Sequence, residues 1–393
     1  MLPNGWKKVK LGDVVKMSSG GTPSKDNASF WDGDIPWISA LEMHKNFVED
    51  AKLNITEEAL KKGSSLAKKN DLLLLTRGSM LWKRIPVCLC LRNVAFNQDV
   101  KCLHANEKLN STFLLYWFGC MEPKIMHMVV GTGIGAGKLE SSGILNLDVN
   151  LPPLEEQKKI AATLSVWDSA IEKMEKLIEA KEISFNSLLK ELIYAPAEKE
   201  CWNIVKLGDV SEMSSGGTPK SSVEKYYNGD VLWVSIADMT EQGMYIKDTA
   251  KKLTKLGVEN SAAKIYPKGT VLYAMYASIG EVSIAEKEMA SSQAILGIQV
   301  SDKLVNKYLY YFLVGQKERI KLQGQAGTQS NLNAGMVKNL NIPLPSIKIQ
   351  NKIIAVLDNG MNELSLLKQQ LENYKKQKQG LMQKLLTGQW RVK

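Results

Sequence analysis

The chain repeats itself once. Trp6 opens a segment that contains Leu-Gly-Asp-Val and then Ser-Ser-Gly-Gly-Thr-Pro, and Trp202 opens a second segment with the same two motifs at the same spacing. Trp37 recurs in the same way as Trp233. These tryptophans repeat with apolar neighbours, so they mark a shared scaffold and belong to its core. The sequence therefore predicts a tandem duplication of a unit of about 195 residues.

Each half ends in a long stretch, residues 155–193 and 348–386, whose apolar residues recur at alternating steps of four and three. This period of 3.5 is typical of a coiled-coil seam. The first seam comprises Ile160, Leu164, Trp167, Ile171, Met174, Ile178, Phe185, Leu188 and Leu192, with Lys181 as its polar member, and the second comprises Ile353, Leu357, Gly360, Leu364, Leu367, Leu371, Tyr374, Leu381 and Leu385, with Lys378 as its polar member. We expect two helices of about 39 residues, roughly 58 Å each, that pack on one another.

The globular parts read as mixed α and β. Short apolar runs at 71–75, 87–91, 270–273 and 282–285 predict buried strands, and aromatic-rich segments at 111–120 and 307–314 predict helices packed on them. The paired glycines and the proline of each Gly-Gly-Thr-Pro motif predict loops. The expected fold class is α+β: two similar mixed domains separated by two long antiparallel helices, in a pseudo-two-fold tandem repeat. The expected boundaries are 1–150 and 198–343 for the domains, and 151–197 and 344–393 for the helices.

Composition restricts the class of partner. The net charge is +10 with 51 Lys and Arg residues, which favours a polyanion, nucleic acid before membrane. No apolar run approaches the length of a membrane span. Five cysteines without a paired framework predict a reducing cytoplasm and no metal site. A lysine-rich surface without function is the competing interpretation of the charge.

The sequence contains no recognisable catalytic motif. The run from Gly131 to Leu139 resembles a phosphate loop, but Leu139 stands where Ser or Thr should follow Lys138. We interpret it as a flexible polar loop whose amides and Lys138 contact a phosphate backbone. The three histidines have unrelated surroundings, and the Asn-Pro-Pro-aromatic motif of amino-methyltransferases is absent. The sequence therefore argues against catalysis in this chain, and no cofactor is expected.

Polar residues that could contact DNA lie in the loops of both halves. Arg, Asn and Gln make bidentate contacts with base edges, whereas Ser, Thr and Lys hold phosphates. The candidates are Ser18, Ser19, Thr22, Arg77, Ser79, Trp82, Lys83, Arg84, Asn97 and Gln98 in the first half, and Ser214, Ser215, Thr218, Lys220, Tyr273, Tyr276, Ser278 and Gln293 in the second. The scaffold agrees between the halves and these residues do not, which predicts two readers of two different short sequences.

With these motifs in place, the chain resembles the specificity subunit of Type I DNA restriction-modification systems. The resemblance rests on the repeated Trp…Leu-Gly-Asp-Val…Gly-Gly-Thr-Pro opening and on Leu151-Pro-Pro-Leu-Glu-Glu-Gln with its copy at Leu344. It extends to the loop at Gly327, which adds Thr328, Gln329 and Asn331 to the candidates. Two departures are the glycine-rich run at 131–139 and Leu81-Trp-Lys-Arg, where the family has a small Ile-Gly turn.

The resemblance implies that the chain binds double-stranded DNA and docks two methylation subunits, which carry the S-adenosylmethionine site and methylate adenine in a bipartite, asymmetric target. Two ATP-dependent restriction subunits join for cleavage. Three alternatives stay open: an enzyme acting on nucleic acid, a protein-binding coiled-coil scaffold, and the specificity subunit of a related system without the ATP-driven subunit.

The long helices have two expected roles. Their length should set an unread spacer between two half-sites. Apolar residues outside the seam, namely Leu177, Ile183, Leu189 and Ile193, are expected either to dock the methylation subunits or to cover the recognition domains of the chain itself.

Overall fold

The structure, a computed structural model, describes residues 2–133, 135–195, 202–276, 278–325 and 332–392, with backbone alone at 318–325. The chain divides into two compact units. Unit 1 comprises residues 1–175 and 370–393, and unit 2 comprises residues 176–369. Each unit therefore holds one globular domain together with a part of each long helix.

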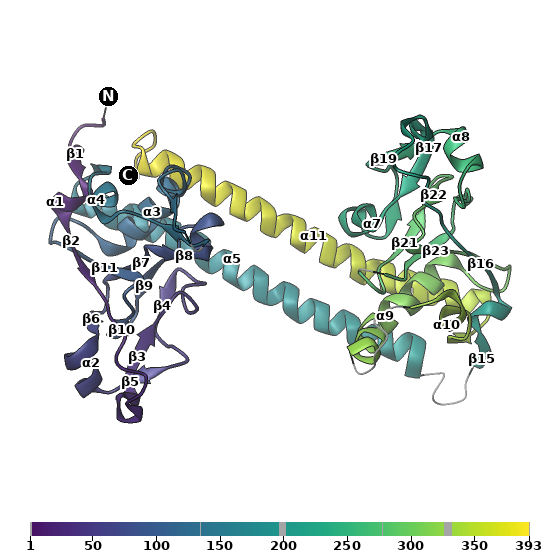
Figure 1. The fold of residues 1–393 in the computed structure, drawn as a ribbon, viewed down its shortest axis with the longest axis horizontal. Helices are drawn as coiled ribbons and strands as arrows, with labels where there is room; N and C mark the ends of the chain where they lie inside the picture. The colour runs from purple at the N-terminus through teal and green to yellow at the C-terminus, as the bar shows by residue number, and fades with distance from the viewer. Residues whose placement is uncertain (1, 134, 196–201, 277, 326–331, 393) are drawn as a thin grey trace. The chain divides into compact units, whose positions relative to one another are not determined.

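A five-stranded sheet forms the centre of unit 1 (Figure 1). Its order is β2 (Val15–Ser19), β11 (Val100–Ala105), β7 (Leu72–Leu75), β9 (Val87–Cys90) and β4 (Phe47–Val48). Neighbouring strands are antiparallel except β4 and β9, which are parallel. β7 and β9 are buried throughout and read as continuous apolar runs, which is why the sequence pattern identified them.

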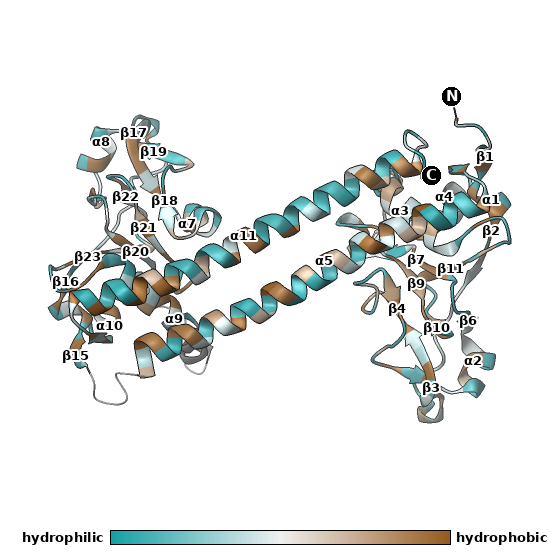
Figure 2. Cartoon of the chain, turned by 180° about the vertical axis from the view of Figure 1, so that it is seen from behind, coloured by the Kyte–Doolittle hydropathy of each residue, from teal (hydrophilic) through white to brown (hydrophobic). Residues whose placement is uncertain are grey.

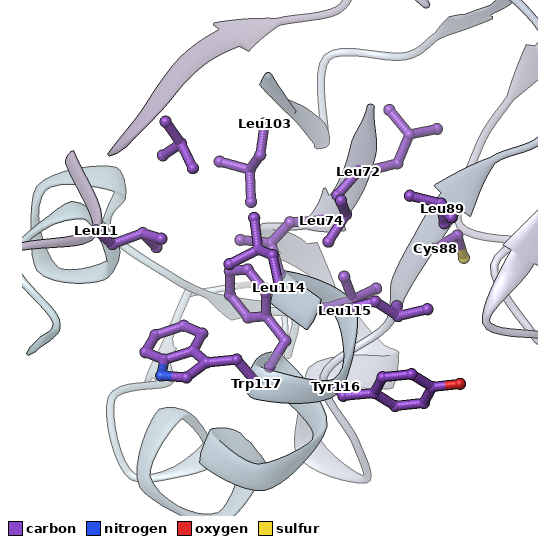
Figure 3. Close-up of a cluster of buried hydrophobic side chains, with 14 of the residues drawn as sticks. Leu11, Leu72, Leu74, Cys88, Leu89, Leu103, Leu114, Leu115, Tyr116 and Trp117 are labelled. Atoms are coloured by element: carbon purple, nitrogen blue, oxygen red, sulfur yellow. The ribbon is translucent and has the colours of Figure 1, made fainter. Parts of the chain in front are cut away.

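Helix α3 (Ser111–Met126) covers this sheet. The side chain of Asn110 caps its N-terminus by accepting a hydrogen bond from Phe113 N at 2.9 Å. Leu114 lies against Leu74 and Leu103, and Leu115 lies toward Leu89, whereas Tyr116 points out of the cluster (Figure 3). The predicted strands and the predicted helix therefore build the core of unit 1.

Smaller elements complete unit 1. A second sheet has the order β5 (Asn54–Ile55), β3 (Trp31–Ile38), β10 (Val94–Phe96) and β6 (Ser65–Ala67), and β1 (Lys7–Lys10) pairs with β14 (Asp148–Leu151). A third sheet joins β12 (Val130–Gly131), β13 (Gly137–Lys138) and β8 (Arg77–Gly78). Short helices are α1 (Leu11–Val14), α2 (Glu57–Gly63), η2 (Ser79–Trp82) and α4 (Ser141–Leu145).

Unit 2 repeats the topology of the central sheet. Its central sheet has the order β16 (Ser211–Ser215), β23 (Ile295–Val300), β20 (Val271–Ala274), β21 (Val282–Ala285) and β18 (Tyr245–Ile246), again with one parallel pair, β18 and β21. Its other pairings are β19 (Lys251–Leu253), β17 (Tyr227–Val234) and β22 (Ala290–Ser291), and β15 (Asn203–Lys206) with β24 (Asn341–Leu344). Its helices are α7 (Ile236–Gln242), α8 (Lys255–Glu259), α9 (Asn306–Gln325) and α10 (Ala334–Lys338).

The long helices are α5 (Leu154–Leu189), extended by a π-helical turn at Lys190–Tyr194, and α11 (Ile347–Leu386). Hydrophobic and hydrophilic residues alternate along both (Figure 2). In unit 1 they pair antiparallel through Trp167 and Tyr374, whose rings meet edge to face at 6.0 Å. The predicted fold class, two similar mixed domains with a long antiparallel helix pair, is confirmed in these terms.

The pairing in unit 2 is equally antiparallel. Lys181 Nζ lies 2.6 Å from Glu363, and Lys368 Nζ lies 2.6 Å from Glu182. The two polar seam residues thus form ion pairs, since Lys378 in unit 1 bonds to Asp168 and lies 5.2 Å from the ring centre of Tyr116. The seam therefore combines apolar contacts with interhelical charge pairs.

Candidate nucleic-acid interface

Three loops meet at one end of the central sheet of unit 1. β2 ends at Ser19, β7 ends at Leu75 and β11 begins at Val100. The register places Lys101 opposite Ser19 and Val100 opposite Leu75. The strands are antiparallel, so the residues after β2, after β7 and before β11 gather at the same end. Most of the candidates predicted in the first half lie in these loops.

The Gly-Gly-Thr-Pro loop is held by close backbone packing. A Cβ at Gly20 would lie 2.2 Å from Phe96 O, and one at Gly21 would lie 2.4 Å from Gly63 O, so only glycine fits at either position. The indole of Trp37 donates to Gly21 O at 3.0 Å, as that of Trp233 does to Gly217 O at 2.9 Å. The tryptophans are therefore scaffold residues, as predicted.

The packing of this loop brings residues that were predicted to contact DNA close to one another. The Thr22 hydroxyl donates to the amide oxygen of Gln98, which is exposed. Ser19 is exposed as well, and its hydroxyl accepts a hydrogen bond from Lys101 Nζ at 2.7 Å. Lys101 was not among the residues predicted from the sequence. Its signal was its place between the buried residues Val100 and Cys102 of a strand, which turns a lysine outward.

A second group follows β7. Arg77, Ser79 and Lys83 are exposed, and Lys138 lies directly opposite Arg77 across β13 and β8. The glycine-rich stretch was interpreted as a flexible loop, but its described residues form a hairpin, because β8 offers β13 a pairing edge. Thr76 links the two groups, since its N–H donates to Asp99 O at 2.8 Å and its hydroxyl at 3.0 Å.

Two candidates are engaged inside the domain. The half-buried guanidinium of Arg84 donates to the backbone oxygens of Met43 and His44. The Asn97 side chain is buried, and its carbonyl oxygen accepts the N–H of Asp99 at 3.1 Å, which shapes the turn before β11. These bonds position the loops around the exposed candidates.

Unit 2 gathers its candidates at the corresponding end of its sheet. Ala274 pairs with Ile295 and Ser215 with Leu296. Ser215, Thr218, Lys220, Tyr276, Ser278 and Gln293 are exposed there, and Ser214 is half-buried. Thr328, Gln329 and Asn331 lie outside the described residues.

Tyr273 does not belong to this surface, and the expectation for it was wrong. Its ring is fully buried in the core of unit 2, because both faces of β20 are covered. Its hydroxyl is buried without a hydrogen-bond partner among the described residues. Burial also raises its pKa above the usual tyrosine range.

Three further observations describe the chemistry of the described residues. Burial raises the pKa of the Cys88 thiol to about 12, so this thiol stays protonated at neutral pH. The described residues contain no group of three potential metal ligands. Nor does a helix within the described ranges have the length and apolarity to cross a membrane. The polar groups at the two sheet ends suit phosphates and base edges.

The four apolar residues outside the seam divide into two pairs. Leu189 and Ile193 are buried against the domain of unit 2, where the Leu189 side chain comes within 2.3 Å of a Cβ placed at Gly315. Leu177 and Ile183 remain 43% and 63% exposed. Leu189 and Ile193 therefore cover the chain's own domain. Of the four residues, only Leu177 and Ile183 are exposed enough to contact a partner.

Comparison with known proteins agrees with this arrangement. The family model "Type I restriction modification DNA specificity domain" matches twice, at residues 3–182 and 199–375. The type I restriction enzyme MjaVIII specificity subunit of Methanocaldococcus jannaschii is 25% identical over 428 aligned positions, which cover 100% of this chain and 94% of that protein. The EcoR124I/EcoR124II specificity subunit of Escherichia coli is 31% identical over 166 residues, 42% of this chain and 41% of that protein.

A chain in a solved structure that concerns "complex assembly and conformational transition of the type I R-M system" has the same fold as this chain. The TM-score is 0.64 at 19% sequence identity, and the match covers 99% of this chain and 100% of that chain. The two family matches cover nearly the whole chain and coincide with its internal repeat. The chain belongs to the Type I restriction modification DNA specificity family.

Proposed function

We propose that this chain, a DNA-specificity subunit of a Type I restriction-modification system, binds a bipartite and asymmetric target through one recognition domain in each unit. The recognition domains are those at residues 1–150 and 198–343. The main support is that the two units share topology and register while the side chains at the corresponding sheet ends differ.

The register makes this comparison residue by residue. Val100 pairs with Leu75 in unit 1, and Ile295 pairs with Ala274 in unit 2, so Arg77 corresponds to Tyr276. In the same way Lys101, opposite Ser19, corresponds to Leu296, opposite Ser215. A cation and an aromatic ring make different contacts with DNA, and Lys101 has no charged counterpart in unit 2, where Leu296 is fully buried. Two sheet ends built this way favour two different half-sites.

The candidates divide between two tasks. Exposed Gln98, Gln293 and Tyr276 have the reach and the polar groups for base edges, whereas Ser19, Thr22, Arg77, Ser79, Lys83, Thr218, Lys220 and Ser278 suit the phosphate backbone. Affinity would come mainly from the phosphate contacts and sequence discrimination from the base contacts.

The partners follow from the same role. Two methylation subunits would supply the S-adenosylmethionine site and transfer the methyl group to adenine, and ATP-dependent restriction subunits would join for cleavage. The exposed apolar residues Leu177 and Ile183 on α5 support a docking surface for the methylation subunits. The chain itself would act as a binding and positioning subunit.

Single-molecule methylome sequencing of cells that carry this chain with its methylation subunits tests the proposal. We expect one methylated motif with two different specified parts and an unspecified spacer. Replacing residues 1–150 with the corresponding domain of a relative should change one part and leave the other. A single continuous motif, or a change in both parts after the replacement, would contradict it. A protein-binding scaffold would bind the same duplex without sequence preference.

A further inference from the structure

Hydrogen bonds join the described residues of the glycine-rich hairpin of unit 1, at 130–133 and 135–138. Val130 pairs with Lys138, and Gly131 with Gly137. The N–H and the hydroxyl of Thr132 both donate to Ala136 O, at 2.8 and 2.9 Å, and Gly135 N–H donates to Thr132 O at 3.0 Å. Gly135 has a φ of +79°, which glycine adopts without strain. These bonds fix the two strands relative to each other.

Trp82 packs against this hairpin and forms a hydrogen bond with it. Its indole N–H donates to Gly135 O at 3.0 Å, and its ring carbons lie 3.8 and 3.9 Å from a Cβ placed at Gly131. A Cβ at Gly137 would lie 3.0 Å from Leu81 Cβ, so the hairpin rests directly on the turn that carries Trp82. The indole is nevertheless 48% exposed, so core packing does not account for its position.

The hairpin sets two cations side by side. Lys138 and Arg77 are directly opposite on neighbouring strands and both are exposed. Like charges at opposite positions of a sheet destabilise the pairing. Glu140 lies 2.7 Å from Lys138 Nζ, but Arg77 makes no hydrogen bond or ion pair with the described side chains. The pair therefore keeps an excess positive charge that an anion bound by both side chains would balance.

The location of the pair indicates which anion. Arg77 follows Thr76, whose N–H and hydroxyl bond to Asp99 O beside Gln98. The pair thus adjoins the Thr22–Gln98 contact at the DNA-facing end of the sheet. Arginine and lysine with a phosphate form charge-assisted hydrogen bonds, the arginine in a bidentate fashion.

We propose that Arg77 and Lys138 form a clamp for one stretch of DNA backbone phosphates, and that Trp82 is the positioning residue that holds the clamp in place. This inference rests on the DNA binding proposed above. In unit 2, Tyr276 stands where Arg77 stands in unit 1, so the clamp belongs to the half-site read by unit 1 alone.

Salt dependence of binding tests the clamp. The chain, purified with its methylation subunits, is titrated with salt on a duplex that holds its methylome-determined target. For R77Q/K138Q we expect the slope of log K against log salt to fall by about 1.8, at 0.9 per phosphate, and affinity at 0.15 M salt to fall about thirtyfold. The methylated motif should stay the same, since phosphates carry no sequence.

Two further sets of variants make the test specific. K16Q/K108Q removes the same charge from exposed positions at the opposite end of the sheet, and should leave the slope nearly unchanged. W82A should lower the slope in the same direction as R77Q/K138Q. W82F should give an intermediate slope, because it keeps the ring and loses the N–H.

The contrary outcomes are distinct. A slope that R77Q/K138Q leaves unchanged would overturn the clamp, and so would an equal fall in K16Q/K108Q. A W82A variant that unfolds at lower temperature yet keeps the parent slope would overturn the positioning role. Absence of sequence-specific binding by the unmodified complex would instead overturn the proposed function itself.

Discussion

Gln157 on α5 and Gln350 on α11 make the same three hydrogen bonds, each inside its own unit. The Gln157 amide donates to Lys108 O and Pro152 O, both at 2.9 Å, and accepts the N–H of Asn110 at 2.8 Å. The Gln350 amide donates to Lys303 O and Pro345 O, both at 2.9 Å, and accepts the N–H of Val305 at 2.8 Å. Both glutamines are fully buried, so each fastens the start of a long helix to the loop before the domain's own helix.

The first prediction concerns this pair. Gln157→Ala leaves two carbonyls and one N–H without partners in a buried site, and each unsatisfied group costs about 1–3 kcal/mol. We expect a loss of about 3 kcal/mol or more in the free energy of unfolding, measured by urea denaturation of the purified chain. Gln350→Ala should cost a similar amount. Gln369→Ala, at an exposed site of α11, is the matched control and should stay within about 0.5 kcal/mol of the parent.

The sequence predicted the parts of the fold whose pattern is local. The predicted strand at 282–285 coincides with β21, and the predicted helix segments lie inside α3 and α9. The Gly-Gly loops, the scaffold tryptophans and the seam were predicted for the same reason. In each case a given residue type at a given spacing is compatible with few local structures.

The predictions that were wrong or missing have a different cause. At those positions the structure depends on residues that are distant in the sequence. The hairpin around Gly135 forms because β13 pairs with the edge of β8. A run of glycines in the sequence does not predict that pairing. Burial of Leu189 depends on the close approach of Gly315 in α9. Tyr273 was expected to end a buried strand and also to reach DNA, but its strand is covered on both faces and keeps the ring in the core. Lys101 was overlooked because a lone lysine in an apolar strand gives a weak signal.

Gly360 permits the close contact of the long helices in unit 2, and this is the basis of the second prediction. A Cβ at Gly360 would lie 2.9 and 3.3 Å from ring carbons of Phe185. Gly360→Leu should therefore destabilise the chain by about 1–3 kcal/mol through overpacking, partly offset by better helix propensity. Gly380→Leu on the same helix meets nothing within 4 Å and should stabilise it by up to about 1 kcal/mol.

A double variant checks the cause. Phe185→Ala combined with Gly360→Leu should lose less stability than the sum of the two single changes, because the leucine fills the space that the ring leaves. Additive losses would show that the ring is not the obstacle. Thermal unfolding followed by circular dichroism gives the comparison.

The third prediction concerns pH. The Arg391 guanidinium, 2.6 Å from Glu156, and then the indole N–H of Trp6 hold the pKa of the Glu156 carboxyl below its usual value. A lowered folded-state pKa gives stability that is present above the unfolded pKa, about 4.3, and is lost as pH falls through the folded pKa. Glu156→Gln should be less stable than the parent at pH 7, and the difference should shrink below about pH 4. A difference that persists unchanged at pH 3 would contradict this.

The fourth prediction tests the docking surface. Leu177→Glu and Ile183→Glu each place a charge at an exposed apolar position of α5. We expect methylation-subunit affinity, measured by co-purification and titration, to fall at least tenfold, because a buried interface residue contributes about 2 kcal/mol. DNA binding by the chain should not change. Ser187→Glu, an exposed polar site of α5, is the control, and unchanged co-purification of both leucine and isoleucine variants would remove this surface from the proposal.

The fifth prediction treats the long helices as the ruler for the spacer. Four residues inserted into α5 alone, about 6 Å of helix, break the 3.5-residue seam, so methylation should be lost or the spacer lengthened. Seven residues inserted into both α5 and α11 keep the seam and add about 10 Å, or about three base pairs at 3.4 Å each. Methylome sequencing should then show the same two half-sites with a spacer longer by about three base pairs. An active double insertion with the parent spacer would show that the helices do not set this distance.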